Sequence, residues 1–359
     1  MQAPSPVRCA QCEAAAPTSL PRLQDPLRTG REGTTMSQPI FFGYRTALEL
    51  CRTPGFPAAA QSNASFRSIP GRAPAKGELR EALDCLCALL PAFASERPLD
   101  CLVGSRSHPH DPGPFQFHAC LHRPPTNAFI RLDDLIYVAA PPYAFIQESS
   151  RSGLVELYQM EYEICGSYSR MPFGRETRYN IPPLATAASL RKYAQRNAEI
   201  RGAHRACKAL RYAADGSASP RETQMVLSLG LPTVQGGEGL GIPIMNYEIA
   251  LTPEARKLCR RRTLRCDMFW PQAKLDVEYQ SRERHEGEES RISDSCRTNA
   301  LLSMGYSVIC VTNDELNRGQ AIEVIAETIR RNIGKRSRTK LEDLPQRKSN
   351  LRRELGLPC

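Results

Sequence analysis

Residues 306–312, YSVICVT, form an uninterrupted apolar and β-branched run. A strand without polar alternation is typical of burial on both faces of a sheet, so helices are needed on both sides. A helix is predicted just before this run, at about 290–304, and it ends at Gly305. A second amphipathic helix is predicted after it, at 313–333, with Asn313 as its cap. The segment therefore predicts a layered α/β fold.

One helix and three strands are predicted ahead of this segment. Ser219 as N-cap, Pro220 at the first helical position and Glu222 two positions later predict a helix over 219–231. The β-branched and aromatic runs MNYEIAL, TLRCDMFW and LDVEYQ predict strands at 245–251, 263–270 and 275–280. The short turn PQAK makes the last two strands antiparallel. The expected order over 219–333 is α-β-β-β-α-β-α.

The rest of the chain has weaker patterns. Residues 1–35 contain Pro, Arg, Ser and Gly without a hydrophobic period, so we expect disorder there, or a true start at Met36. Residues 36–170 predict an α+β domain of unknown role, and residues 171–218 predict a basic helical connector. Within the first of these, helices are expected at 40–52, 77–90 and 153–166, and strands at 99–104, 115–121 and 128–139.

The composition is that of a globular chain. Hydrophobic residues make up 41% and charged residues 24% of 359 positions, which is enough for two domains with cores. No apolar run approaches the ~20 residues that cross a bilayer, and the first residues lack the order of a secretory signal. The scattered cysteines are expected to be reduced thiols. These features favour a cytoplasmic protein without membrane contact.

Basic residues exceed acidic ones, 48 against 38, which gives a formal charge of +10. Arg201, Arg205 and Lys208 are spaced so that they share one helical face, where they could neutralise phosphates. A solvated helix face is the alternative. Residues 334–359 carry eight cations and three acids and are expected to form a basic flexible tail that binds polyanions, or else a plain soluble tail.

Two acids stand out on the predicted hairpin. Strand alternation places Asp276, Glu278 and Gln280 on one face of 275–280, and a short turn brings Asp267 within a few Å of Glu278. Two such carboxylates repel each other unless a cation or a proton intervenes. Mg²⁺ accepts one or two carboxylates, keeps several waters and can activate an attacking water. Magnesium is therefore the expected cofactor.

This set of motifs resembles the PD-(D/E)xK nuclease superfamily, in the branch of very-short-patch-repair endonucleases and abortive-infection-type relatives. The resemblance covers about 219–333. It rests on the phrases SPRE at 219–222, CDMFWP at 266–271, LDVEYQS at 275–281, DSCRTNAL at 294–301 and GYSVICVT at 305–312. It implies a restriction-endonuclease-like α-β-β-β-α-β core with a final helix, metal-dependent hydrolysis of phosphodiester bonds in DNA, and DNA as partner.

The resemblance also implies roles for individual residues. Asp267 and Glu278 match the two metal-binding acids, and Glu222 matches an acid on the first helix that completes the cluster. His285 matches a histidine that follows the third strand. Arg297 matches a basic residue that contacts phosphate or stabilises the fold. Four of them have simpler alternatives. Glu222 suits helix capping, and Asp267 could be an exposed acid on the strand face. Glu278 could pair with Arg265 across the hairpin, and His285 lies in a charged surface loop.

Gln280 departs from the family pattern, where Lys is usual. An amide can position a water by hydrogen bonding, but it carries no charge and cannot act as a base. This substitution keeps open a second function, in which the same fold serves a non-catalytic DNA-binding regulator or antitoxin-like protein. The sequence also leaves open the target sequence, DNA versus RNA, and whether the chain forms a homodimer.

Overall fold

The fold is known from a computed structural model, which describes residues 36–93, 95, 97–106, 113–170, 176–280, 288–336 and 341–358. Within these ranges the chain is mixed α/β. Residues Met36–Cys359 form one compact unit, and the finer domain boundaries expected at residues 170, 218 and 333 stay predictions. Residues 1–35 lie outside the described part. No helix among the described residues is both long and apolar enough to cross a membrane.

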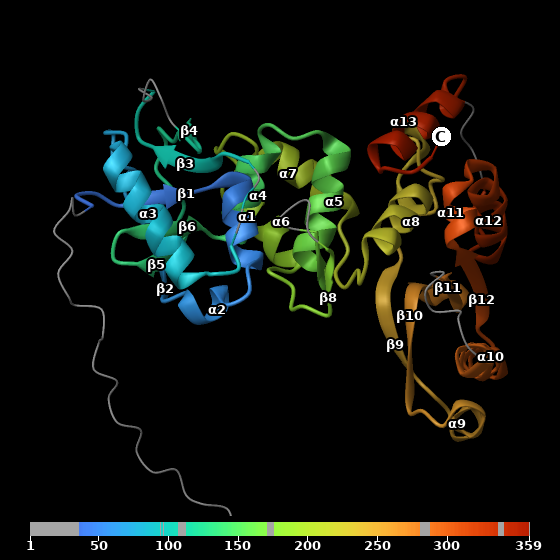
Figure 1. Cartoon of the computed structure of the whole chain (residues 1–359). Helices are drawn as coiled ribbons and strands as arrows, with labels where there is room; N and C mark the ends of the chain where they lie inside the picture. Colours follow the sequence, from blue (N-terminus) through green and yellow to red (C-terminus); the bar gives the residue numbers. More distant parts are fainter. Residues whose placement is uncertain are drawn as a thin grey trace, which may run out of the picture. The chain divides into compact units, whose positions relative to one another are not determined.

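A four-stranded sheet carries most of the predicted site (Figure 1). Its strands lie in the order β12-β11-β10-β9, with β9 at Ile244–Ala250, β10 at Thr263–Trp270, β11 at Leu275–Gln280 and β12 at Ser307–Thr312. β9, β10 and β11 pair antiparallel, whereas β11 and β12 pair parallel. Parallel neighbours need a crossover, which the helix α10 (Glu288–Ser303) supplies.

Helices lie before and after this sheet, and the single helix expected at 313–333 is divided into two. α8 (Pro220–Gly230) precedes the sheet, while α11 (Asn313–Asn317) and α12 (Gly319–Asn332) follow β12. One further helix, α9 (Pro253–Cys259), joins β9 to β10 and was not predicted. The sequence does contain a helix-start signal at this place. Thr252 is the N-cap, whose side chain accepts from Ala255 N, and Pro253 follows in the first turn.

Alternation along the strands gives the sheet two apolar faces. Val277 and Met268 belong to the large core that includes Val226 of α8 and Ile322 of α12. The other face is a smaller core in which β9 and β10 pack against α9 and α10. Its buried members are Ile249, Leu251, Ala255, Leu264, Cys266, Phe269, Ala300 and Leu301. Helices therefore cover both faces, as the apolar run at 306–312 predicts.

A six-stranded mixed sheet organises the N-terminal part, in the order β2-β5-β6-β1-β3-β4. The strands are β1 (Ile40–Phe42), β2 (Ser62–Ala64), β3 (Leu99–Val103), β4 (Phe115–Ala119), β5 (Phe129–Asp133) and β6 (Ile136–Ala139). The expected helix at 40–52 is wrong at its start, because Ile40–Phe42 are a fully buried strand between β6 and β3. An apolar triplet this short cannot be told from a helix start by periodicity alone.

Helices pack against this sheet and against one another. They are α1 (Tyr44–Arg52), α2 (Phe56–Ala59), α3 (Lys76–Leu89), α4 (Pro141–Ser149) and α5 (Leu154–Cys165). The helices expected at 77–90 and 153–166 correspond to α3 and α5. A two-stranded ribbon of β7 (Tyr168–Ser169) and β8 (Arg178–Tyr179) follows α5.

The expected connector contains two short helices, α6 (Ala187–Arg196) and α7 (Ala203–Ala209), both packed on α4. The expectation of one helical face carrying Arg201, Arg205 and Lys208 is wrong for Arg201. Gly202 takes a left-handed conformation with φ of 102°, so α7 begins only at Ala203 and Arg201 lies in the preceding turn. All three cations are exposed.

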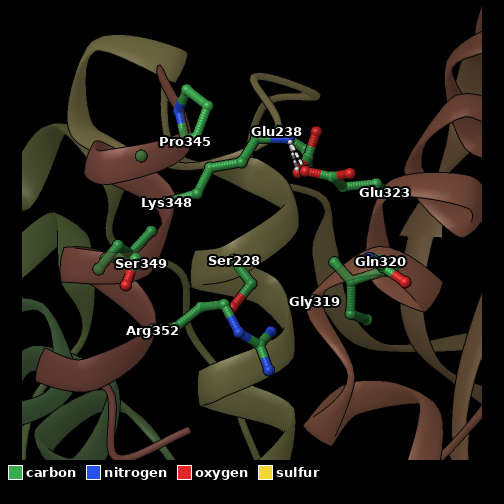
Figure 2. A pocket seen from close by; sticks show the side chains of 12 residues that line it. Ser228, Glu238, Gly319, Gln320, Glu323, Pro345, Lys348, Ser349 and Arg352 are labelled. Atoms are coloured by element: carbon green, nitrogen blue, oxygen red, sulfur yellow. Dashed lines mark hydrogen bonds and ion pairs between the residues drawn. The ribbon is translucent and has the colours of Figure 1, made fainter. Parts of the chain in front are cut away.

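The expectation of a flexible C-terminal tail is also wrong. Residues Leu344–Glu354 form the helix α13, and Leu351 and Leu355 are both 2% exposed. Lys348 Nζ lies 2.6 Å from Glu238 Oε1 and 2.8 Å from Glu323 Oε1. Figure 2 marks the interactions among these side chains with dashed lines. The cations of this segment therefore serve in part to dock it, because apolar residues alternate with them at helical spacing.

Candidate functional site

The strands β10 and β11 stop pairing at Met268–Val277, in the middle of both strands. Beyond this point β10 continues beside β9, and β11 continues beside β12. Past this point, the N–H of Tyr279 on β11 donates to Asp267 Oδ2 at 2.9 Å. A carboxylate thus takes the place of a ladder carbonyl. We call this divergence the strand fork, with Asp267 on one branch and Glu278 on the other.

Arg297 of α10 joins the two branches. Its Nη2 donates to the carbonyl of Arg265 on β10 and to Oε1 of Glu278 on β11. The side chains of Arg297 and Glu278 are 25% and 14% exposed, so this ion pair is largely removed from water. The alternative in which Glu278 pairs with an arginine therefore holds for Arg297 and not for Arg265, which contributes its carbonyl.

Burial and crowding disturb the acids of the fork. Burial, followed by the charges of Glu278 and Glu222, raises the pKa of Asp267 to about 8. Burial and the neighbouring Asp276 raise the pKa of Glu278 to about 9, although Arg297 opposes this shift. Perturbed groups of this kind gather at functional sites, because their charged forms lack a full complement of partners.

Asp276 is the residue that sequence reasoning missed. It is 0% exposed, and neither of its carboxylate oxygens has a hydrogen bond of good geometry within the described residues. Burial raises its pKa, and the nearby side chains of Glu278 and Cys266 oppose that rise as hydrogen-bonding neighbours. A buried carboxyl group with so weak a set of partners is costly in free energy, so it keeps its proton or binds a cation. The signal in the sequence was strand alternation, which places Asp276 on the same face as Glu278.

Cys266, Asp276 and Glu278 offer a Cys Sγ and two carboxylate oxygens that all lie within 4.8 Å of one another. Among the described residues this is the one set of three or more such ligands at that spacing. The carboxylates suit Mg²⁺ or Mn²⁺, and the thiol suits softer divalent ions. Burial raises the pKa of the Cys266 thiol, so the carboxylates are the better donors here.

Glu222 does not join this set of ligands. Its carboxylate accepts from Ala218 N at 2.9 Å, from Ser219 Oγ at 3.0 Å and from Asn246 Nδ2 at 2.8 Å. The Ser219 hydroxyl in turn accepts from Glu222 N at 3.1 Å. These bonds form a capping arrangement at the start of α8. Glu222 acts on the fork only through its charge, which helps to raise the pKa of Asp267.

The remaining predicted residues divide into three groups. Gln280 and Arg297 line, with Glu278, a small pocket of about 60 Å³ between the sheet and α10. His285 lies outside the described residues. Of the four cations expected to bind nucleic acid, Arg297 alone contacts an acid of the fork in the described chain.

A second pocket, of about 210 Å³, lies among α8, α12 and α13 (Figure 2). It is lined by Ser228, Glu238, Lys348 and Arg352, and none of the residues predicted for the site is part of it. The chemistry expected from the sequence therefore belongs to the strand fork.

No family model, no curated protein and no solved structure matches this chain.

Proposed function

We propose that the strand fork binds a divalent cation and hydrolyses phosphodiester bonds in nucleic acid, in the manner of a restriction-endonuclease-like core. One observation carries the proposal. Asp267, Asp276 and Glu278 are crowded and largely shielded from water, and Arg297 contacts one of them, Glu278. Burial raises the pKa of all three acids, so protons balance their charge at neutral pH, and a divalent ion would take the place of those protons.

The order of elements supports the same proposal. An antiparallel hairpin followed by a helix and a parallel strand is the arrangement implied by the resemblance to PD-(D/E)xK nucleases. In that family the metal-binding acids belong to the hairpin, which is where Asp267 and Glu278 lie. A cytoplasmic location belongs to the proposal as well, because all the described cysteines are free thiols.

The residues would divide the work as follows. Asp276 and Glu278, whose oxygens lie within 4.8 Å of each other, would hold the cation. Asp267 does not belong to that close set and would be a further ligand from the other branch of the fork. When bound, such an ion would polarise a phosphodiester and lower the pKa of a coordinated water. Gln280 lines the same pocket as Glu278, so its side-chain amide could hold an attacking water by a hydrogen bond. Arg297 neutralises Glu278 and can donate to a phosphate oxygen.

The test is cleavage of duplex DNA, single-stranded DNA and RNA in Mg²⁺ or Mn²⁺ by the full chain. We expect Asp267→Asn and Glu278→Gln to reduce cleavage by about 10²-fold or more, as loss of a metal ligand does. Glu248→Gln is the matched control, because Glu248 is an exposed acid on β9 of the same sheet. Equal cleavage by all four proteins would show a contaminating nuclease and refute the proposal.

A non-catalytic nucleic-acid-binding regulator is the second candidate. Two observations favour it. Gln280 stands where the family usually has Lys, and Arg297 already donates to the Glu278 carboxylate, where the enzyme would need a cation. Binding that persists in EDTA in a gel-shift assay, with no product when metal is added, would select this candidate over the enzyme.

A further inference from the structure

We infer that the hairpin end formed by β9, α9 and β10 is a clamp for the phosphodiester backbone of nucleic acid. It carries six cations within ten positions, and we call this set the basic arm. Its members are Arg256, Lys257, Arg260, Arg261, Arg262 and Arg265. The inference rests on the proposed function for the identity of the partner, and it concerns residues that neither composition nor family resemblance pointed out.

All six cations of the basic arm are exposed, and none of them forms an ion pair within the described chain. Arg256 Nε donates to the carbonyl of Leu251 at 2.9 Å, which leaves the rest of its guanidinium facing water. The nearby acids are Glu254 and Glu248, both exposed. Cations elsewhere in the fold are frequently paired, as Lys348 is with Glu238, so this unpaired group stands apart.

The fold holds the basic arm in place. The hairpin strands β9 and β10 run past the end of β11 to α9, as Figure 1 shows. Ala255 of α9 is buried with Ala300 and Leu301 of α10 in the smaller core. The arm is therefore anchored to the same helix that supplies Arg297 to the strand fork. Binding a ligand costs less conformational entropy when the backbone that carries the cations is already fixed in this way than when it is mobile.

The position along β10 connects the arm to the fork. Arg262 directly precedes β10, and Asp267 follows it by five positions, or roughly 17 Å at a rise of about 3.3 Å per residue. That distance corresponds to about five base pairs of a duplex. Arg265 lies between them, two positions from Asp267. A nucleic acid strand that places one phosphate at the fork would thus place phosphates several nucleotides away against the arm.

The chemistry of the arm fits a polyphosphate chain rather than a single anion. Neutralising phosphates releases condensed counterions. On duplex DNA, each phosphate contact therefore lowers the logarithm of the binding constant by about 0.9 for a tenfold rise in salt concentration, and we call this dependence the salt slope. Three contacts through Lys257, Arg261 and Arg262 would contribute up to about 2.7 to this slope. A solvated surface without a partner would contribute nothing.

The experiment measures binding of the full chain by fluorescence anisotropy in EDTA, over a series of salt concentrations. The probes are a 20-base-pair duplex DNA, a single-stranded DNA, a duplex RNA of the same length and vesicles of phosphatidylserine and phosphatidylcholine. The variants are Lys257→Gln/Arg261→Gln/Arg262→Gln and the charge-preserving Arg261→Lys/Arg262→Lys. The comparison is Arg201→Gln/Arg205→Gln/Lys208→Gln, which removes three exposed cations from another surface.

We expect the first variant to lower the salt slope on duplex DNA by up to about 2.7, and the lysine variant to keep it. The comparison variant should keep most of it as well. An equal loss in both triple variants would show an effect of net charge alone and overturn the inference, as would tighter binding to vesicles than to any nucleic acid. Because EDTA prevents metal-dependent cleavage, this result does not depend on whether the fork is catalytic.

Discussion

Asp267 accepts a hydrogen bond from the backbone N–H of Tyr279 at 2.9 Å, where β10 and β11 cease to pair. The bond fixes the carboxyl group between two strands, where burial and the charge of Glu278 raise its pKa. Such a position has a cost in stability, because like charges in a buried place repel each other. Sites that bind cations store this kind of strain until the ion arrives.

We therefore expect Asp267→Asn to stabilise the metal-free chain. The amide oxygen can still accept from Tyr279, and the repulsion with Glu278 is gone. The gain in the free energy of unfolding should be about 1 kcal/mol at pH 8. Urea denaturation in EDTA measures it. A less stable variant would mean that the Asp267 charge is a structural element, contrary to the proposed metal site.

Arg297 should be necessary for the fold. Removal of its guanidinium leaves the Glu278 carboxylate without its cation and the Arg265 carbonyl without its donor. Loss of one partner of a largely buried ion pair costs about 3–5 kcal/mol. Thermal unfolding of Arg297→Gln measures this cost, and Arg265→Gln, which changes an exposed side chain, should have an effect within about 0.5 kcal/mol. Similar behaviour of both variants would contradict the bridging role.

Glu161 should make stability depend on pH. Its carboxyl oxygens are buried without partners in the described chain, and burial raises its pKa well above the usual 4.5. The folded chain then keeps a proton that the unfolded chain releases, so stability falls as pH rises above 4.5, by at most about 1.4 kcal/mol per pH unit. Urea unfolding from pH 5 to 8 should show a flatter profile for Glu161→Gln. Parallel profiles would show that Glu161 does not titrate in this way.

Arg352 should hold α13 in place. It donates through Nε to Pro358 O at 2.8 Å and through Nη2 to Asn317 O at 2.8 Å, and it is 8% exposed. Arg352→Ala should expose residues 344–354 to faster hydrogen exchange and cost about 1–3 kcal/mol. Arg353→Ala is the matched control, because Arg353 is exposed and bonds only to Asn350 among described side chains. Unchanged exchange in Arg352→Ala would contradict the docking of this helix.

The sequence predicted which strands carry the acids of the site, but not which side chains are buried there or what they contact. Strand alternation and a short turn were enough to place Asp267 and Glu278 on neighbouring strands, since both signals are local. The burial of Asp276 depends on α10, which comes from a later segment, and no local pattern shows that a helix will cover an acid. The bridge from Arg297 to Arg265 depends on the same tertiary contact.

Other misses have the same origin. Ile40–Phe42 form a strand because β6 and β3 pair on either side, with partner residues 59 or more positions away. The charged tail folds because Leu351 and Leu355 find an apolar surface on distant helices, which outweighs its charge. The sequence left two roles open for Glu222, an acid of the metal site or a helix cap. Its three hydrogen bonds support the capping role.

The most direct test of the account is calorimetric titration of the full chain with Mn²⁺ at pH 8. The account predicts one site in the wild type, and at least about tenfold weaker binding in Asp267→Asn and Glu278→Gln. Glu248→Gln should bind as the wild type does. Absence of binding in the wild type, or equal affinity in all four proteins, would contradict a metal site at the strand fork.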